Sequence, residues 1–113
     1  KYTEGKSKPD FIFPSIDDYH DPKFPVARLT MLGAKTTIKE RWRQVLDEAD
    51  RIEDKHLVTL EPAVSEDYTR AMAKDRLSLV VPSSLFETYT PAQREWLMSV
   101  NDFCRLVEAR QHE

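Results

Sequence analysis

The clearest pattern of apolar and polar positions in the chain lies between residues 38 and 52. Apolar side chains recur there at steps of three and four residues, which is the spacing of one buried face of an amphipathic helix. They are Ile38, Trp42, Val45, Ala49 and Ile52. Thr36 or Thr37 can cap the first turn, and Glu40 follows Thr37 at capping-box spacing. We therefore expect a helix from this cap to about Ile52.

Short apolar runs, several of them ended by proline, predict four strands. They cover residues 10–13, 26–34, 56–60 and 77–81. The fourth run is apolar enough to form a central strand. In the second run, Gly33 can supply an unusual backbone angle just before Lys35.

Two more helices are expected in the second half of the chain. Ser65 can cap a short helix to about Lys74, with Tyr68 and Met72 facing inward. The last helix begins at a strong signal, a threonine cap followed by proline and, three residues after the cap, glutamine.

The apolar positions of this last helix would share one buried face. They are Trp96, Val100, Phe103 and Val107. The order strand, strand, helix, strand, helix, strand, helix predicts an α/β fold with a mixed sheet flanked by helices.

Composition narrows the class of protein. The 113 residues suffice for one domain with a modest core, and no apolar run approaches the roughly 18 residues of a membrane span. A net charge of −3 argues against a protein that coats nucleic acid generally, but not against an enzyme whose positive charge is confined to one cleft. Cys104 is the lone cysteine, so a disulfide framework is excluded, and we expect it to pack as a small apolar residue.

The first residue is Lys1 rather than methionine, and residues 1–8 are polar. We interpret this stretch as a flexible tail or linker remnant ahead of a single domain. We also expect the parent protein to continue upstream.

Three residues suggest phosphodiester chemistry. Asp10 opens the first strand, Lys35 lies at the junction of the second strand with the helix, and Glu48 lies on the flank of the buried helix face. If the two strands pair, Asp10 and Lys35 meet at a strand end, and Glu48 must reach back to them. Taken singly, each has a plainer interpretation: a turn residue for Asp10, a solvated lysine for Lys35, and for Glu48 one of several exposed acids, beside Asp47 and Asp50.

Together these residues form a PD…(x)K…E arrangement within a longer block, residues 33–44, that runs from Gly33 to Gln44. With Pro9-Asp10, with residues 55–60 (Lys-His-Leu-Val-Thr-Leu) and with residues 79–82 (Leu-Val-Val-Pro), this block resembles the PD-(D/E)xK nucleases. Within them it is similar to restriction endonucleases of the EcoRII, SsoII and PspGI type. The resemblance covers nearly the whole chain and implies a restriction-endonuclease-like fold in a cytoplasmic prokaryotic enzyme.

The resemblance implies Mg²⁺-dependent cleavage of double-stranded DNA by a homodimer, at a short palindrome of the CC…GG type. Carboxylates are the hard oxygen ligands that Mg²⁺ prefers, so Asp10 and Glu48 are the expected ligands, with the carbonyl of Ala34 as a third. Lys35 would orient or activate the water. In the resembled enzymes a tyrosine follows the PD strand at a similar spacing, which makes Tyr19 a further catalytic candidate.

The loop around Tyr19, residues 15–25, is also rich in aspartate. It could bind a metal, but a solvated acidic loop is the plainer interpretation.

Four neighbouring charged residues are candidates for DNA recognition. They are Lys39, Glu40, Arg41 and Arg43. Arginine can form two hydrogen bonds to guanine, and a carboxylate can accept one from cytosine, so the cluster suits a G·C-rich site. Alternatively, Glu40 caps the helix, and Arg43 belongs to a solvated face with intrahelical ion pairs.

A second hypothesis comes from another class of protein: a non-catalytic DNA-binding or assembly module with a nuclease fold. The resembled enzymes place a further glutamate upstream of the PD strand, and a chain without that segment could bind DNA and cut poorly. A third is an unrelated α/β domain in which the motif residues occur by chance.

Overall fold

The computed structural model describes residues 10–39 and 41–112. Eleven elements are found in these residues, of which three are 3₁₀ helices, labelled η. In chain order they are β1 (Phe11–Phe13), α1 (Ile16–His20), η1 (Val26–Arg28), β2 (Thr30–Ala34), η2 (Arg41–Asp47), β3 (Lys55–Val58), α2 (Glu66–Lys74), β4 (Leu77–Val80), η3 (Ser83–Thr88), α3 (Pro91–Trp96) and α4 (Val100–Gln111).

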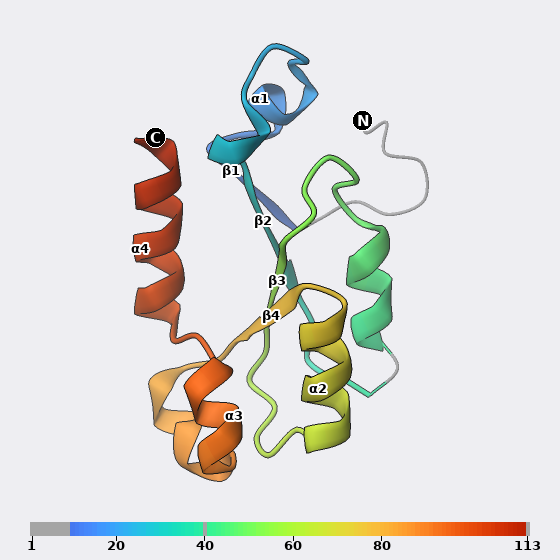
Figure 1. Ribbon diagram of the computed structural model, residues 1–113, viewed down its shortest axis with the longest axis vertical. Helices are drawn as coiled ribbons and strands as arrows, with labels where there is room; N and C mark the ends of the chain where they lie inside the picture. Colours follow the sequence, from blue (N-terminus) through green and yellow to red (C-terminus); the bar gives the residue numbers. More distant parts are fainter. Residues whose placement is uncertain (1–9, 40, 113) are drawn as a thin grey trace.

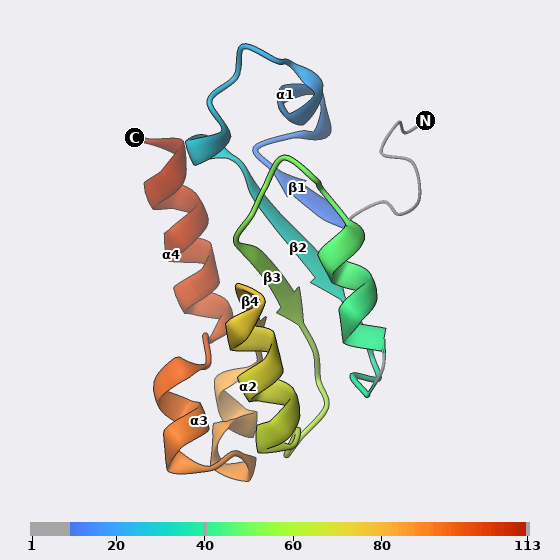
Figure 2. The same ribbon diagram turned by 45° about the vertical axis from the view of Figure 1, so that its right-hand side comes forward.

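The strands form a mixed sheet in the order β1-β2-β3-β4. β1 pairs antiparallel with β2, with Phe11 opposite Leu32, while β2, β3 and β4 run parallel. The first two strands do pair, which is the condition for Asp10 and Lys35 to meet, and the predicted α/β class is confirmed. α4 lies on one side of the sheet, and η2 and α2 lie on the other (Figures 1 and 2).

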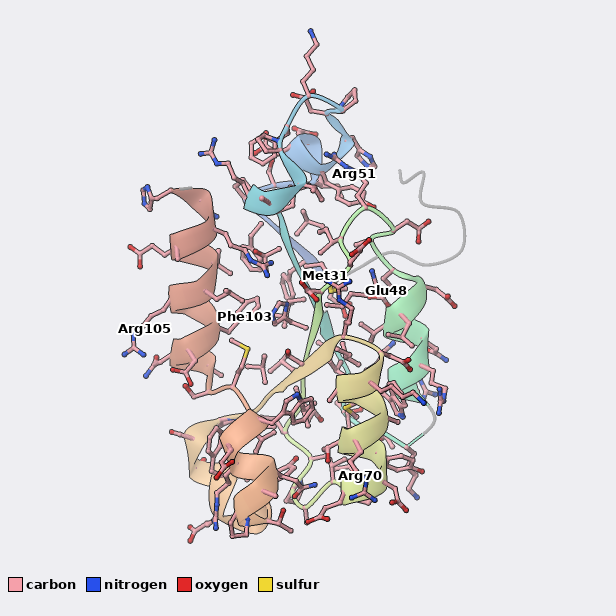
Figure 3. All side chains as sticks on the ribbon, in the orientation of Figure 1. Met31, Glu48, Arg51, Arg70, Phe103 and Arg105 are labelled. Carbon is pink, nitrogen blue, oxygen red and sulfur yellow. The ribbon has the colours of Figure 1, made fainter. Side chains whose placement is uncertain are left out.

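Strand residues and the helix faces beside them form one apolar core. The most deeply buried members include Leu29, Met31, Leu57 and Leu79 from the strands and their approaches, and Met72 from α2. On the opposite face of the sheet, Phe103 packs edge-on against the rings of Phe13 and His56. Figure 3 shows Phe103 on the inner side of α4 and Arg105 on its outer side. Both faces of the sheet are therefore covered, and this holds the strands in place.

The prediction of a long α-helix over residues 37–52 is wrong in both helix type and length. The segment forms the seven-residue 3₁₀ helix η2, which begins only at Arg41, while Thr36 and Thr37 lie in irregular, exposed chain; Glu40 falls outside the described residues. Ala49 ends the helical path because its φ of 51° lies in the left-handed region. The apolar spacing still predicted burial correctly, since all five side chains of the pattern are 4% exposed or less.

The prediction of a single C-terminal helix is also wrong. The threonine start is confirmed, because Thr90 and Gln93 form a capping box, but α3 stops at Trp96. Met98 then forms a parallel bridge with Val80, and Ser99 caps a new helix, α4. Backbone pairing with the sheet interrupts the helix, so Val100 is exposed rather than part of a continuous buried face.

The structure differs from the sequence prediction in several smaller ways. The acidic loop contains the short helix α1, capped by Ser15. The second predicted strand begins only at Thr30, after η1. β4 is the last strand of the described sheet rather than a central one. Cys104 is exposed, so its expected packing role is wrong.

Candidate active site

The carboxylate of Asp10 reaches across the sheet to β2. Its Oδ2 accepts a hydrogen bond of 2.6 Å from the backbone amide of Ala34. The register explains this contact: Phe11 lies opposite Leu32, so the residue before Phe11 stands beside the end of β2. Asp10 and Ala34 are both exposed to solvent.

Lys35 follows directly and leaves the sheet at this edge. Its backbone amide donates to the carbonyl of Val58 in the parallel strand β3, which fixes where β2 ends. Its ammonium Nζ lies 3.3 Å from Oε1 of Gln44 in η2, and the side chain is half-buried. The lysine is therefore directed toward η2 rather than out into solvent.

Glu48 comes one residue after η2 and is only 4% exposed, whereas its neighbours Asp47 and Asp50 are exposed. Burial raises its pKa from the ordinary 4.5 to about 7, Lys35 opposes that rise, and Asp10 adds to it. Glu48 is therefore close enough to both predicted partners to sense their charges. In Figure 3 it lies on the side of η2 that faces the sheet and Met31. The plainer interpretation of Glu48, an exposed helix acid, is wrong.

Gly33 makes this approach possible through its small size. A Cβ at this position would lie 3.1 and 3.3 Å from the two methyl groups of Val45 and 3.4 Å from Oε1 of Glu48. Gly33 lies within β2, without a left-handed backbone angle, so the unusual angle expected from the sequence is wrong. The missing side chain lets η2 pack closely on the strand.

The turn after Glu48 is held by a buried cation. Nζ of Lys55 donates to the carbonyl of Ala49, at 3.1 Å, and to that of Ile52. These bonds stabilise the left-handed turn at Ala49 that directs Glu48 back toward the sheet. Lys55 also opposes the rise in the pKa of Glu48, though less than Lys35 does.

Tyr19 is buried in α1 and is bound to the same turn. Its hydroxyl accepts a hydrogen bond from the amide of Arg51 at 3.1 Å. The Arg51 guanidinium lies over the Tyr19 ring and donates to the carbonyls of Tyr19, Asp21 and Phe24. These contacts bind Tyr19 to Arg51, three residues after Glu48. A direct catalytic role for Tyr19 stays a prediction.

The candidate DNA-recognition residues project from the start of η2. Lys39, Arg41 and Arg43 are exposed, and Arg43 lies over the ring of Trp42, 4.4 Å from its centroid. The fourth, Glu40, lies outside the described residues. Three cations therefore stand on the surface in the chain between Lys35 and Gln44.

The donor set fits a hard divalent cation. Oε1 of Glu48 is buried and has no hydrogen-bond partner in the described part of the chain. Mg²⁺ commonly binds through one or two carboxylates, keeping several waters. Asp10, Glu48 and the carbonyl of Ala34 are the groups that would hold it. Among residues 10–39 and 41–112, no cluster of three or more His, Cys, Asp or Glu side chains is arranged to bind a metal, and this includes the aspartates of the 15–25 loop.

A comparison with protein families settles the family. The model described as "EcoRII C terminal" matches residues 1–104. This chain belongs to the EcoRII C-terminal family. The matched range contains every candidate site residue, from Asp10 to Glu48.

Relatives of this EcoRII C-terminal chain agree with that placement. It is 52% identical over 101 residues to the type II restriction enzyme EcoRII of Escherichia coli. The match covers 89% of this chain and 25% of that enzyme. The chain thus spans about a quarter of the length of the curated relative it matches.

Two solved structures share the fold. Metal-depleted Ecl18kI in complex with uncleaved DNA matches with a TM-score of 0.77 and 23% identity, over 96% of this chain and 37% of that one. Metal-depleted Ecl18kI in complex with uncleaved, modified DNA matches with a TM-score of 0.76 and 21% identity, over 92% of this chain and 35% of that one. The restriction-endonuclease-like fold expected from the sequence is confirmed. In the described part of the chain, no helix is long and apolar enough to cross a membrane.

Sequence reasoning missed several residues that shape the site in this EcoRII C-terminal domain. Gln44, Lys55 and Arg51 act by contacting Lys35, the Glu48 turn and Tyr19 respectively. Gln44 and Lys55 entered the sequence analysis only as members of the segments that carry the resemblance, and the predicted third strand began after Lys55. Arg51 is a polar residue in a charged segment, and only the fold reveals the partners of all three.

Proposed function

We propose that this chain is the catalytic part of a Mg²⁺-dependent type II restriction endonuclease that cleaves double-stranded DNA at a short CC…GG-type palindrome. The observation that carries the proposal is the meeting of Asp10, Lys35 and Glu48 at the exposed end of β2. The hydrogen bond from Ala34 to Asp10 supports it, as does the sensitivity of the Glu48 pKa to both Lys35 and Asp10.

Each residue would have a distinct task. Asp10 and Glu48, with the Ala34 carbonyl, would bind the metal ion, which when bound supplies Lewis-acid stabilisation of the phosphoryl oxygens and an activated water. Lys35 would orient the attacking water and offset charge that develops on the phosphate. Gln44 would hold Nζ of Lys35, because it accepts from the ammonium at 3.3 Å.

DNA recognition would come from the segment 39–43. Lys39, Arg41 and Arg43 are exposed in the chain that follows Lys35, and guanidinium groups can donate two hydrogen bonds to guanine. Glu40 would accept from cytosine. A palindromic site matches a two-fold protein, so we propose a homodimer acting on DNA in the prokaryotic cytoplasm.

The experiment is cleavage of a plasmid carrying CC…GG sites by the full-length protein, with Mg²⁺ and with EDTA. We expect discrete fragments whose ends map to those sites, only when Mg²⁺ is present. Lys35→Ala should abolish the fragments. Fragments of undiminished yield from Lys35→Ala, or with EDTA, would contradict the catalytic assignment.

A second candidate function is a DNA-binding module that does not cut. The exposed cations Lys39, Arg41 and Arg43 would serve DNA binding in either case. A gel-shift assay on the same DNA separates the two functions. Specific binding without cleavage at any Mg²⁺ concentration would favour the binding module.

A further inference from the structure

We propose that Glu61 is a positioning residue that fixes the chain directly before the recognition residues Lys39, Arg41 and Arg43 and thereby sharpens discrimination between DNA sites. The proposal rests on the function proposed above. Glu61 lies on the chain between β3 and α2, well outside the catalytic motif. Its carboxylate Oε1 accepts a hydrogen bond of 2.7 Å from the backbone amide of Ile38, the residue directly before the segment.

Ile38 is firmly anchored in the irregular chain that joins β2 to η2. Its side chain is fully buried, while Thr36, Thr37 and Lys39 are exposed. Its carbonyl accepts from the amides of Arg41 and Trp42, at 2.8 and 3.1 Å. The bond from the Ile38 amide to Glu61 therefore completes a three-point attachment, and the side chains that follow inherit its position.

Glu61 is itself fixed at both backbone groups. Its amide donates to Oγ1 of Thr59 at 3.1 Å, and its carbonyl accepts from the hydroxyl of the buried Tyr89 at 2.5 Å. The fixed backbone sets where the side chain starts, and the bond to the Ile38 amide holds its carboxylate, which suits positioning rather than adaptable binding. Tyr89 follows η3, so Glu61 connects the Ile38 amide to the end of η3.

The role needs an acceptor oxygen and does not need the charge. A glutamate near exposed Lys39 and Arg41 would also repel the phosphate backbone that those cations attract. A glutamine keeps an acceptor on a side chain of the same length. Glu61→Gln should therefore keep discrimination and bind DNA at least as tightly, whereas Glu61→Ala should lose discrimination.

The test measures two quantities in the full-length protein. The first is the ratio of dissociation constants for a CC…GG duplex and for the same duplex with one base pair changed. The second is the hydrogen-exchange rate of the Ile38 amide. We expect Glu61→Ala to lower the discrimination ratio by about tenfold, the order of one well-placed base contact, and to speed exchange at Ile38. Glu61→Gln should match the wild type in both.

Two further variants guard against trivial outcomes. Glu108→Ala removes an exposed acidic charge from α4, on the opposite side of the sheet, and should leave both quantities unchanged. Tyr89→Phe keeps the Glu61 carboxylate but removes the hydrogen bond to its backbone carbonyl, and it should lower the discrimination ratio by about threefold. It replaces Glu61→Ala as the test if that variant does not fold.

Unchanged exchange at Ile38 in Glu61→Ala overturns the inference, whatever the DNA result. A ratio that Glu61→Gln fails to preserve also overturns it, because the charge would then be the essential property. If the wild type does not discriminate between the duplexes, the proposed function fails, and the claim that Glu61 sharpens discrimination fails with it. Exchange at Ile38 then decides only whether Glu61 anchors the segment.

Discussion

Asp10 accepts the backbone amide of Ala34 at 2.6 Å, and this hydrogen bond joins the PD motif to the lysine that follows Ala34. One oxygen of the carboxylate is thus used by the fold itself. A residue used in this way stays in position whether or not a metal is bound. The same contact makes a conservative test possible, because an asparagine oxygen can replace the accepting oxygen.

Gln44 should support Lys35. Gln44→Ala removes the acceptor 3.3 Å from Nζ, so the lysine samples more rotamers, and we expect cleavage to slow by about three- to tenfold. Single-turnover rates at saturating Mg²⁺ measure the effect. Gln111→Ala at the end of α4 is the matched control and should cut at the wild-type rate; equal rates for both variants would remove Gln44 from the site.

A side chain at position 33 should destabilise the fold. In Gly33→Ala the new Cβ would crowd Val45 and Glu48, which we expect to cost about 1–3 kcal/mol of unfolding free energy and to displace Glu48. Urea unfolding measures the stability. Thr36→Ala, on exposed chain nearby, should change it by less than about 0.5 kcal/mol. A stable and fully active Gly33→Ala would show that η2 can shift without consequence.

Metal-free stability should fall as pH rises, because of Glu48. Its folded pKa is about 7 against an ordinary 4.5, so between these values the folded protein holds a proton that the unfolded chain releases. The favourable contribution is full below pH 4.5 and is lost as pH rises to about 7, with a size on the order of 3 kcal/mol.

Unfolding in EDTA at pH 5 and pH 8 tests this, with Glu48→Gln for comparison. The variant keeps a neutral side chain at both pH values, so it should be the more stable protein at pH 8 and lose less stability between them. Parallel losses in the two proteins would mean that Glu48 is ionised without penalty in the fold.

Arg51 should matter to stability far more than a surface arginine. Arg51→Ala removes donors to three backbone carbonyls and the packing on Tyr19, and we expect a loss of about 2–3 kcal/mol. Among the described residues, Arg70 forms ion pairs only with exposed acids of α2, so Arg70→Ala should change stability by less than about 0.5 kcal/mol. Figure 3 shows the two arginines at opposite ends of the molecule. Thermal unfolding of both variants provides the comparison.

The sequence predicted which side chains would be buried better than it predicted helix geometry. The pattern from Ile38 to Ile52 identified a real buried face, yet the chain there is a short 3₁₀ helix followed by a left-handed turn. The turn depends on Lys55, whose ammonium satisfies the carbonyls of Ala49 and Ile52 from a neighbouring strand. A tertiary contact of this kind leaves no periodic signal.

The same reasoning explains the site. Motif spacing was enough to propose Asp10, Lys35 and Glu48, because pairing of β1 with β2 follows from two apolar runs. The burial of Glu48 depends on the close packing that Gly33 permits, and the break between α3 and α4 depends on pairing of Met98 with Val80. Both are long-range effects that override local propensity.

The most direct test of the central claim is plasmid cleavage by full-length Asp10→Asn beside Asp17→Asn. Asparagine preserves an acceptor for the Ala34 amide but loses the charge that would bind the metal, while Asp17 is an exposed residue of α1. We predict that Asp10→Asn folds normally and cuts at least about a hundredfold more slowly at saturating Mg²⁺, with Asp17→Asn unchanged. Cleavage by Asp10→Asn at the wild-type rate would contradict the account.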